Sequence, residues 1–154
     1  MSVEQNKAIV SRFYGELWNN RNFSIADEII SPNCMTHQLQ SGAVSAGISR
    51  DAEAVKHHVN EWLSGFPDLH FTVEQMIAEE DLVVSQSVMR GTHTGSWLGI
   101  APTNKEVSIR LMVTQRIVDG KIIEDWVLVE ALGFFQELGL LPTTQEIISN
   151  ITKR

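Results

Sequence analysis

The chain has 154 residues, a formal net charge of −7 and one cysteine. This length suits one domain that buries a core without disulfides or metal, and the single Cys34 excludes both an intrachain disulfide framework and a zinc site built from several cysteines. The acidic charge and the lack of a lysine or arginine cluster argue against a nucleic-acid-binding surface or an anionic-membrane surface.

The N-terminus and the apolar runs carry no sign of targeting. MSVEQNKAIV lacks a basic segment followed by a long apolar stretch, and no apolar run approaches the roughly 20 residues of a membrane span. One cysteine suits a reducing compartment. We therefore expect a single domain over residues 1–154, located in the cytoplasm, with neither a membrane nor a nucleic acid as partner.

The first third of the sequence has helical spacing. Apolar residues between Ile9 and Leu17 recur at three and four positions after a capping box formed by Ser2 and Gln5, and NNRN ends the run. Residues 23–30 predict a short second helix that ends before a Ser-Pro pair.

A third helix is expected after a glycine-containing loop. Ser49 can cap it, Val55, Val59 and Trp62 lie on its apolar face, and Gly65 with the following proline ends it. Three helices therefore precede any strand in this interpretation.

From residue 69 the apolar period changes to two, which is typical of strands. Four segments follow, namely LHFTVEQMIA, LVVSQSVMRGTHTG, EVSIRLMVTQRIV and KIIEDWVLVEAL, and an Asp119-Gly120 hairpin turn joins the last two. The remaining residues predict a helical turn and, after a capping box of Thr143 and Glu146, a final helix. Helices followed by an antiparallel meander indicate an α+β domain whose helices cover the concave face of one sheet.

Three stretches carry a family resemblance: GTHTGSWLGIAPTNKEV (91–107), RIVDGKIIEDWVLVEALGFFQELGLLP (116–142) and FYGELWNNRNFSIADEIISPNCMTHQ (13–38). Together they resemble the SnoaL-like polyketide cyclases, also called ester cyclases, of the NTF2-like superfamily. The resemblance implies a cone-shaped α+β barrel, in which a strongly bent antiparallel sheet and N-terminal helices enclose an apolar pocket. It also implies a homodimer, a small hydrophobic ligand, and chemistry without metal or organic cofactor.

Glu130 is the first candidate acid/base. In an extended strand it shares a face with Trp126 and Leu128, so it is either a mouth residue in contact with water or a partly desolvated acid with a raised pKa. The resemblance implies an acid/base aspartate four residues after the tryptophan, the position that Glu130 occupies. Asp125 points to the opposite face by alternation and is discounted as a catalytic group.

Two histidines are the next candidates. His93 lies between threonines and glycines at a strand end, where it could donate a hydrogen bond to a developing enolate oxygen or could simply fix the turn from Gly91 to Gly95. His37 follows the second helix, at a place where the resemblance implies a polar pocket residue. His58 on the third helix is interpreted as a hydrogen-bonded core or interface group.

The walls of the pocket are expected to be aromatic and apolar. Trp97 lies on a loop that the resemblance places at the pocket mouth, where a flat ring would suit a flat polycyclic ligand. Arg110 shares its strand face with a second arginine, which favours a solvated or subunit-contact surface over an oxyanion site. The full predicted lining is Tyr14, Trp18, Trp62, Trp97, Trp126 and Met112.

The leading function from these residues is a cofactor-independent cyclase or isomerase. It would abstract a proton next to a carbonyl in a hydrophobic polycyclic or polyketide-like substrate and close a ring by intramolecular aldol condensation. Two alternatives stay open: a ligand-binding protein of the same fold without catalysis, and a hydrolase or hydroxylase in which two carboxylates activate water.

Overall fold

The computed structural model describes residues 2–38 and 47–153. Its elements in chain order are α1 (Val3–Arg12), η1 (Phe13–Asn19), α2 (Ile25–Ile29), β1 (Ile30–Gln38), β2 (Ile48–Ser49), α3 (Ala52–Gly65), β3 (His70–Glu79), β4 (Leu82–Thr92), β5 (Glu106–Val118), β6 (Lys121–Val129), α4 (Ala131–Glu137) and α5 (Thr144–Thr152). Within the described residues, no helix is both long enough and apolar enough to cross a membrane.

The first helix begins where the sequence predicts. The Ser2 hydroxyl accepts a hydrogen bond from the Gln5 backbone N–H, and Gln5 Oε1 accepts one from the Ser2 backbone N–H, so the capping box is confirmed. The helix then widens into η1, a π-helical segment that reaches Asn19. The second helix ends at Ile29, in agreement with the Ser-Pro stop signal.

The interpretation of residues 30–38 and 47–51 was wrong in two respects, and the rest of the predicted glycine-containing loop, residues 39–46, lies outside the described residues. The segment after the second helix is a nine-residue strand, β1, which pairs with β6 in parallel and with the short β2 antiparallel. Its pairing with β6 shifts register between Ile30 and Met35, and Pro32 lies in this irregular stretch, which hides the period-two signal. The cap of α3 is Asp51, whose carboxylate accepts from Ala54 N at 2.9 Å, because Ser49 belongs to β2.

The meander of four strands from β3 to β6 is confirmed. Asp119 and Gly120 have positive φ values of 49° and 77°, the geometry of the predicted tight hairpin turn. The complete sheet has six strands in the order β2-β1-β6-β5-β4-β3. It is antiparallel apart from the β1–β6 pair.

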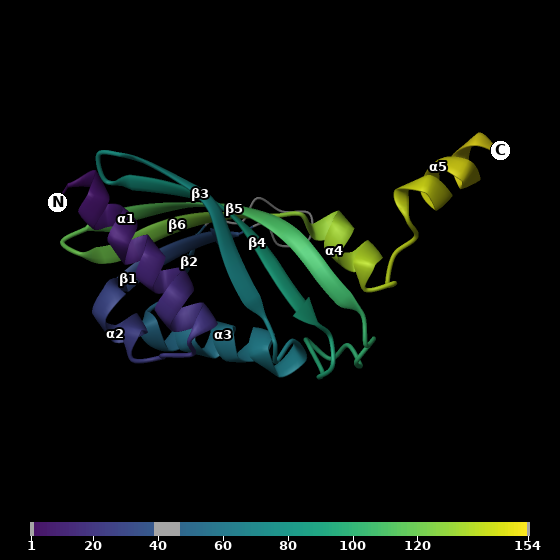
Figure 1. Ribbon diagram of the computed structural model, residues 1–154, viewed down its shortest axis with the longest axis horizontal. Helices are drawn as coiled ribbons and strands as arrows, with labels where there is room; N and C mark the ends of the chain where they lie inside the picture. The colour runs from purple at the N-terminus through teal and green to yellow at the C-terminus, as the bar shows by residue number, and fades with distance from the viewer. Residues whose placement is uncertain (1, 39–46, 154) are drawn as a thin grey trace.

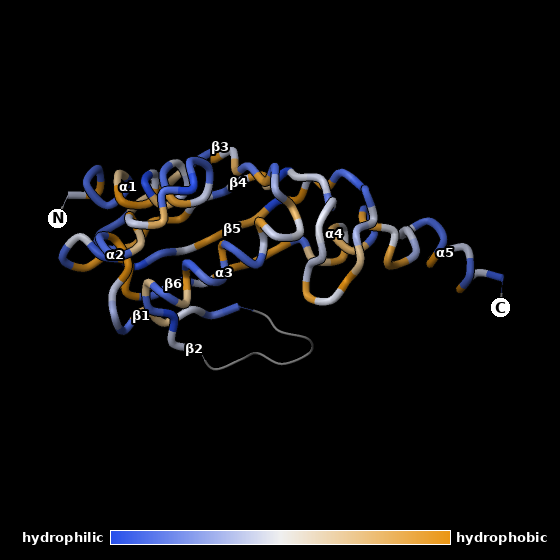
Figure 2. Tube along the Cα trace, turned by 90° about the horizontal axis from the view of Figure 1, so that it is seen from below, coloured by the Kyte–Doolittle hydropathy of each residue, from blue (hydrophilic) through white to orange (hydrophobic). Residues whose placement is uncertain are grey.

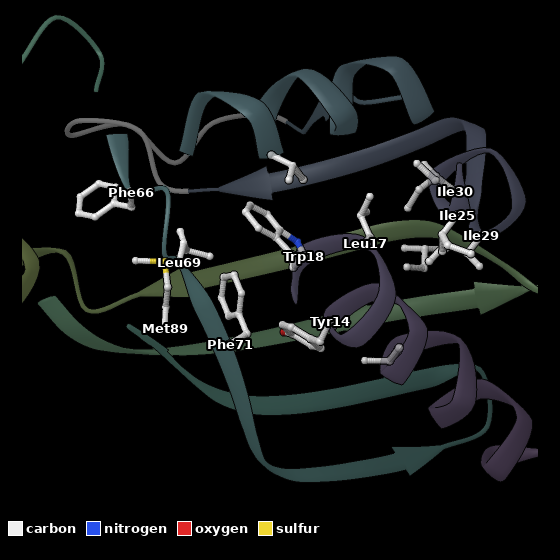
Figure 3. Packing of buried hydrophobic residues seen from close by; sticks show 14 of the residues in the cluster. Tyr14, Leu17, Trp18, Ile25, Ile29, Ile30, Phe66, Leu69, Phe71 and Met89 are labelled. Atoms are coloured by element: carbon white, nitrogen blue, oxygen red, sulfur yellow. The ribbon is translucent and has the colours of Figure 1, made fainter. Parts of the chain in front are cut away.

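The sheet curls around the N-terminal helices, which lie against one of its faces (Figure 1). A continuous cluster of buried side chains joins α1, η1, α2 and α3 to that face, with Leu17, Val59 and Ile109 each at 1% exposure or less. Figure 3 shows Tyr14 and Trp18 of η1 between the helices and the strands. The α+β class and the bent sheet predicted from the sequence are thus confirmed.

The C-terminal helix stands apart from this core. α5 begins with the predicted capping box of Thr143 and Glu146, and none of its residues is buried. Figures 1 and 2 show it beyond α4, at the opposite end of the long axis from the N-terminus.

Candidate functional site

An apolar pocket lies between the helices and the concave face of the sheet. The empty space between its walls is about 830 Å³, a value that includes open solvent at the mouth. Because most side chains of the lining are apolar or aromatic, the space suits a hydrophobic organic ligand. Its lining is Phe13, Tyr14, Trp18, Ile30, Cys34, Thr36, Gln38, Arg50, Val55, His58, Trp62, Phe71, Met89, Ile109, Leu111, Val113, Asp125, Val127 and Val129.

The aromatic wall is built by the π-helical segment η1. A π-helical stretch is rare and often marks a functional site, and here it carries Phe13, Tyr14 and Trp18 into the lining. The Tyr14 hydroxyl lies 2.9 Å from Ser85 Oγ on β4, so the ring is fixed at its far end. Burial, the largest cause, raises the pKa of Tyr14, which therefore stays a neutral phenol.

Asp125 is the one carboxylate that the described residues contribute to the lining. Its backbone is opposite Thr36 in the parallel β1–β6 pair, and alternation puts Val127 and Val129 on the same concave face. Burial raises the pKa of Asp125 to about 6, against the lowering effects of a hydrogen bond with Thr36 and the positive charge of Arg50. Its Oδ1 is buried and has no hydrogen-bond partner among the described residues. Asp125 is thus the partly desolvated acid that the sequence analysis sought at Glu130.

Two other polar groups of the lining respond to the same environment. Burial lowers the pKa of His58 to about 4, so its imidazole is neutral at pH 7. Burial raises the pKa of Cys34 to about 12, which keeps the thiol protonated. Arg50 adds a guanidinium group to the same lining.

Glu130 lies outside this lining. It is exposed and forms the N-cap position of α4, just beyond the end of β6. Of the two alternatives that the sequence left open, contact with water fits this position. Leu128, on the same alternating face, is 55% exposed, so that face is the outer one. The catalytic role of Glu130 stays a prediction, and Asp125 is the group that the sequence analysis discounted and the structure places in the pocket.

His37 lies on the outer side of the sheet as well. Its ring stacks on Trp126 at a centroid distance of 5.2 Å, and its Nε2 lies 2.9 Å from Glu124 Oε1. Glu124 in turn forms an ion pair with Arg116 at 3.4 Å. His37 and Trp126 are both absent from the pocket lining, so this cluster braces β1 against β6 from outside.

His93 and Trp97 belong to the core beside the pocket. His93 is fully buried, its ring stacks on Phe66, and its Nδ1 accepts a hydrogen bond from Thr103 N at 3.2 Å. This geometry fits the role of fixing the turn. Trp97 is 7% exposed and contacts Trp62, Phe66 and Phe134, so it is packed in an aromatic cluster instead of lying open at a mouth.

The predicted lining overlaps in part with the walls of this pocket. Tyr14, Trp18 and Trp62 face the pocket. Trp97, Trp126 and Met112 lie outside the lining, and Met112 is 48% exposed on the outer face beside Leu128, its partner across β5 and β6. The reason is the assignment of faces: the residues before and after Trp126, and not Trp126 itself, point inward. The signal that could have found Asp125 is its alternation with Val127 and Val129.

No set of three histidine, cysteine, aspartate or glutamate side chains within residues 2–38 and 47–153 is placed to hold a metal ion.

Comparison with known proteins gives one family and many similar structures. The sequence model described as SnoaL-like polyketide cyclase matches residues 8–138. None of the curated proteins matches this chain. AclR from Streptomyces galilaeus, proposed to be a hydroxylase, is 28% identical over 99% of this chain and 92% of its own, with a TM-score of 0.80.

Two further structures extend this picture. IdmH from Streptomyces antibioticus, proposed to be a polyketide cyclase, is 26% identical over 88% of this chain and 99% of its own, with a TM-score of 0.75. A proposed SnoaL-like polyketide cyclase from Jannaschia sp. CCS1 is 23% identical over 90% of this chain and 94% of its own, with a TM-score of 0.78. At that identity, the last likeness concerns the fold alone.

Proposed function

The chain belongs to the SnoaL-like polyketide cyclase family, and from this premise we propose that it is a cofactor-independent cyclase or isomerase whose acid/base is Asp125. The reaction is proton abstraction next to a carbonyl in a hydrophobic, polyketide-like substrate. The observation that carries the proposal is the position of Asp125: one carboxyl, with a pKa of about 6, in a pocket that is otherwise mostly apolar.

The raised pKa suits the chemistry. At pH 7 a group with a pKa of about 6 is mostly ionised, so the carboxylate is ready to accept a proton. It is also a stronger base than a solvated aspartate, because the conjugate acid holds its proton more tightly. The buried Oδ1 without a partner is free to meet a ligand C–H or O–H.

In the proposed reaction, Asp125 takes up one proton and later returns it. Asp125 removes a proton from carbon next to a carbonyl, and the electron pair of that C–H bond forms the enolate. The enolate carbon attacks a second carbonyl of the same molecule, which forms the new carbon–carbon bond and an alkoxide. Protonated Asp125 then returns its proton to the alkoxide, so no external oxidant or reductant is consumed.

The walls contribute orientation. Phe13, Trp18 and Trp62 present flat rings to the ligand, and Val127 and Val129 follow Asp125 along the same face of β6. A folded polyketide chain held between such surfaces has its reacting carbons close together, which lowers the entropic part of the barrier. The same surfaces exclude water from the enolate.

The test uses deuterium exchange, because it requires only the first step. We expect the wild-type protein to accelerate exchange of the C1 protons of 2-tetralone in D2O, followed by proton NMR. Asp125→Asn should lose about a hundredfold or more of that acceleration, the usual contribution of a general base. Glu130→Gln is the matched control and should keep it.

The outcomes separate the remaining readings. Loss of exchange in Glu130→Gln with retention in Asp125→Asn would return the acid/base to Glu130, as the sequence analysis predicted. Ligand binding without exchange in any variant would favour the binding-protein alternative. The similarity to AclR favours hydroxylation as a second candidate, for which oxygen consumption with a bound polycyclic phenol is the direct measurement.

The proposal includes a cytoplasmic homodimer formed through the outer sheet face. Met112 and Leu128 are opposite each other on β5 and β6, and both are about half exposed on that face. Burying this pair against a second copy would remove apolar surface from water. Sedimentation equilibrium of wild type and Leu128→Glu tests the proposal, which predicts a dimer and a monomer respectively.

A further inference from the structure

Arg50 holds the positive charge of the pocket lining. Among the described residues, the lining contains two basic side chains, Arg50 and His58, and His58 is neutral at pH 7 because burial lowers its pKa to about 4. The same residues contribute one carboxylate to the lining, that of Asp125. The pocket therefore offers an incoming ligand one cation and one anion against a mostly apolar background.

The backbone fixes where this cation lies. Arg50 N donates to Cys34 O at 2.8 Å, so Arg50 sits beside β1, between β2 and the start of α3. Asp125 is on the other side of β1, opposite Thr36. With strands about 4.8 Å apart, the two backbones are separated by about 10 Å. Arg50 and Asp125 thus face the same cavity from positions on either side of one strand.

The guanidinium of Arg50 has no ion pair among the residues that the structure describes. Asp51, the carboxylate next to it in the chain, accepts a hydrogen bond from Ala54 N in the first turn of α3. Asp125 is near enough for the charge of Arg50 to lower its pKa, yet it does not come within salt-bridge distance. Five N–H donors in a planar fork are therefore available to a ligand.

The Arg50 side chain is half-buried in the lining, where an anionic oxygen of a ligand can accept hydrogen bonds from its N–H groups. Carboxylate and enolate oxygens match the guanidinium fork, and a charge-assisted hydrogen bond is about twice as strong as a neutral one. The formal net charge of −7 repels anions in general, so any preference of the pocket for an anion must come from a local cation.

We propose that Arg50 binds an anionic oxygen of the ligand, a carboxylate or an enolate, while the aromatic wall holds its hydrophobic body. The ligand class is thus a hydrophobic aromatic or polyketide acid, or a ketone that is held as its enolate. This inference rests on the proposed function for the choice of pocket, and it assigns to Arg50 a positioning and charge-neutralising role distinct from the proton transfer of Asp125.

The test compares two isosteric probes by calorimetric titration: 2-naphthoate and 2-naphthamide. Wild type should bind naphthoate at least about tenfold more tightly than naphthamide, the size of one charge-assisted hydrogen bond. Arg50→Met keeps the aliphatic stem and removes the charge, and it should abolish that preference. Arg110→Met is the matched control, because Arg110 is 67% exposed at its side chain and lies outside the lining, and it should retain the preference.

A second probe distinguishes the two sources of negative charge. Ionisation of bound 2-naphthol, followed by absorbance against pH, mimics enolate formation. Wild type should lower the pKa of the bound naphthol relative to Arg50→Met. A lowered naphthol pKa without a preference for naphthoate would assign Arg50 to the enolate, and the converse to a substrate carboxylate.

Arg50→Lys guards against a merely structural effect, since it keeps the charge and should keep part of the preference. Equal affinity of wild type for naphthoate and naphthamide together with an unchanged naphthol pKa, or failure of all three probes to bind, would overturn the inference. The proposed function can fail separately. Exchange activity that Asp125→Asn retains would refute the proposed function and leave the naphthoate preference of Arg50 intact. Equal affinity for naphthoate and naphthamide would refute the Arg50 inference and leave proton exchange by Asp125 intact.

Discussion

Asp125→Asn should stabilise the protein at neutral pH, even though it removes the proposed base. The carboxylate is ionised at pH 7 in a site that disfavours charge, since burial is the largest cause of its raised pKa. Asparagine has nearly the same shape and carries no charge, so the substitution removes the desolvation cost. A catalytic group that destabilises the fold is the expected trade between stability and activity.

The sign and size follow from linkage. The folded-state pKa of about 6 is above the ordinary value of 3.8, so between these two pH values the unfolded chain loses its proton first. Stability of the wild type therefore falls, relative to the variant, as pH rises from about 4 to about 7. The full difference corresponds to about 3 kcal/mol, an upper value because water entering the open side of the pocket reduces it.

Urea unfolding at several pH values between 4 and 8 measures this difference. The free energy of unfolding of Asp125→Asn minus that of wild type should rise with pH and level off above pH 7. Glu130→Gln serves as control, because Glu130 is exposed and lies outside the pocket lining. A difference for Asp125→Asn that does not change with pH, or that falls as pH rises, would refute the assignment of Asp125 as a buried acid.

Three further predictions concern His58 and Cys34 of the pocket lining and Gly95 outside it. Wild type should lose up to about 3 kcal/mol of stability relative to His58→Phe as pH falls from 6.5 to 4, since the folded-state pKa of His58 is about 4; urea unfolding measures this. Cys34 should resist a thiol reagent at pH 8 in the native state and react on unfolding, because its pKa is about 12. Gly95→Ala should lower the melting temperature, since a Cβ there would lie 1.8 Å from Ser64 O, whereas Gly15→Ala, with nothing within 4 Å, should not.

Local signals in the sequence were sufficient for most of the elements. The capping boxes at Ser2 and Thr143 and the Asp119-Gly120 turn depend on side chains three residues apart or on the backbone freedom of two residues. Such signals do not need the rest of the chain. Strand β1 was missed because its pairing is with β6, some ninety residues later, and its irregular first half carries no period-two pattern.

In the candidate site, too, one feature follows from local sequence and another only from the packing of the fold. Alternation along β6 correctly separates Asp125 from Glu130, because it depends on strand geometry alone. Which of the two faces is the concave one depends on how the sheet curls and on which side the helices pack. The aromatic residues of η1 and α3 line the same pocket as Asp125, and only the assembled fold decides this.

The sequence by itself determined the family, the α+β class, the meander and three aromatic residues of the pocket wall, because these follow from local spacing and from motifs within single stretches. Only the tertiary structure decided the charged groups of the pocket. Arg50 and Asp125 are 75 positions apart in the chain, and they face one cavity because β1 lies between their backbones. Their electrostatic environment is a property of that packing, since burial shifts a pKa only once the surrounding walls are in place.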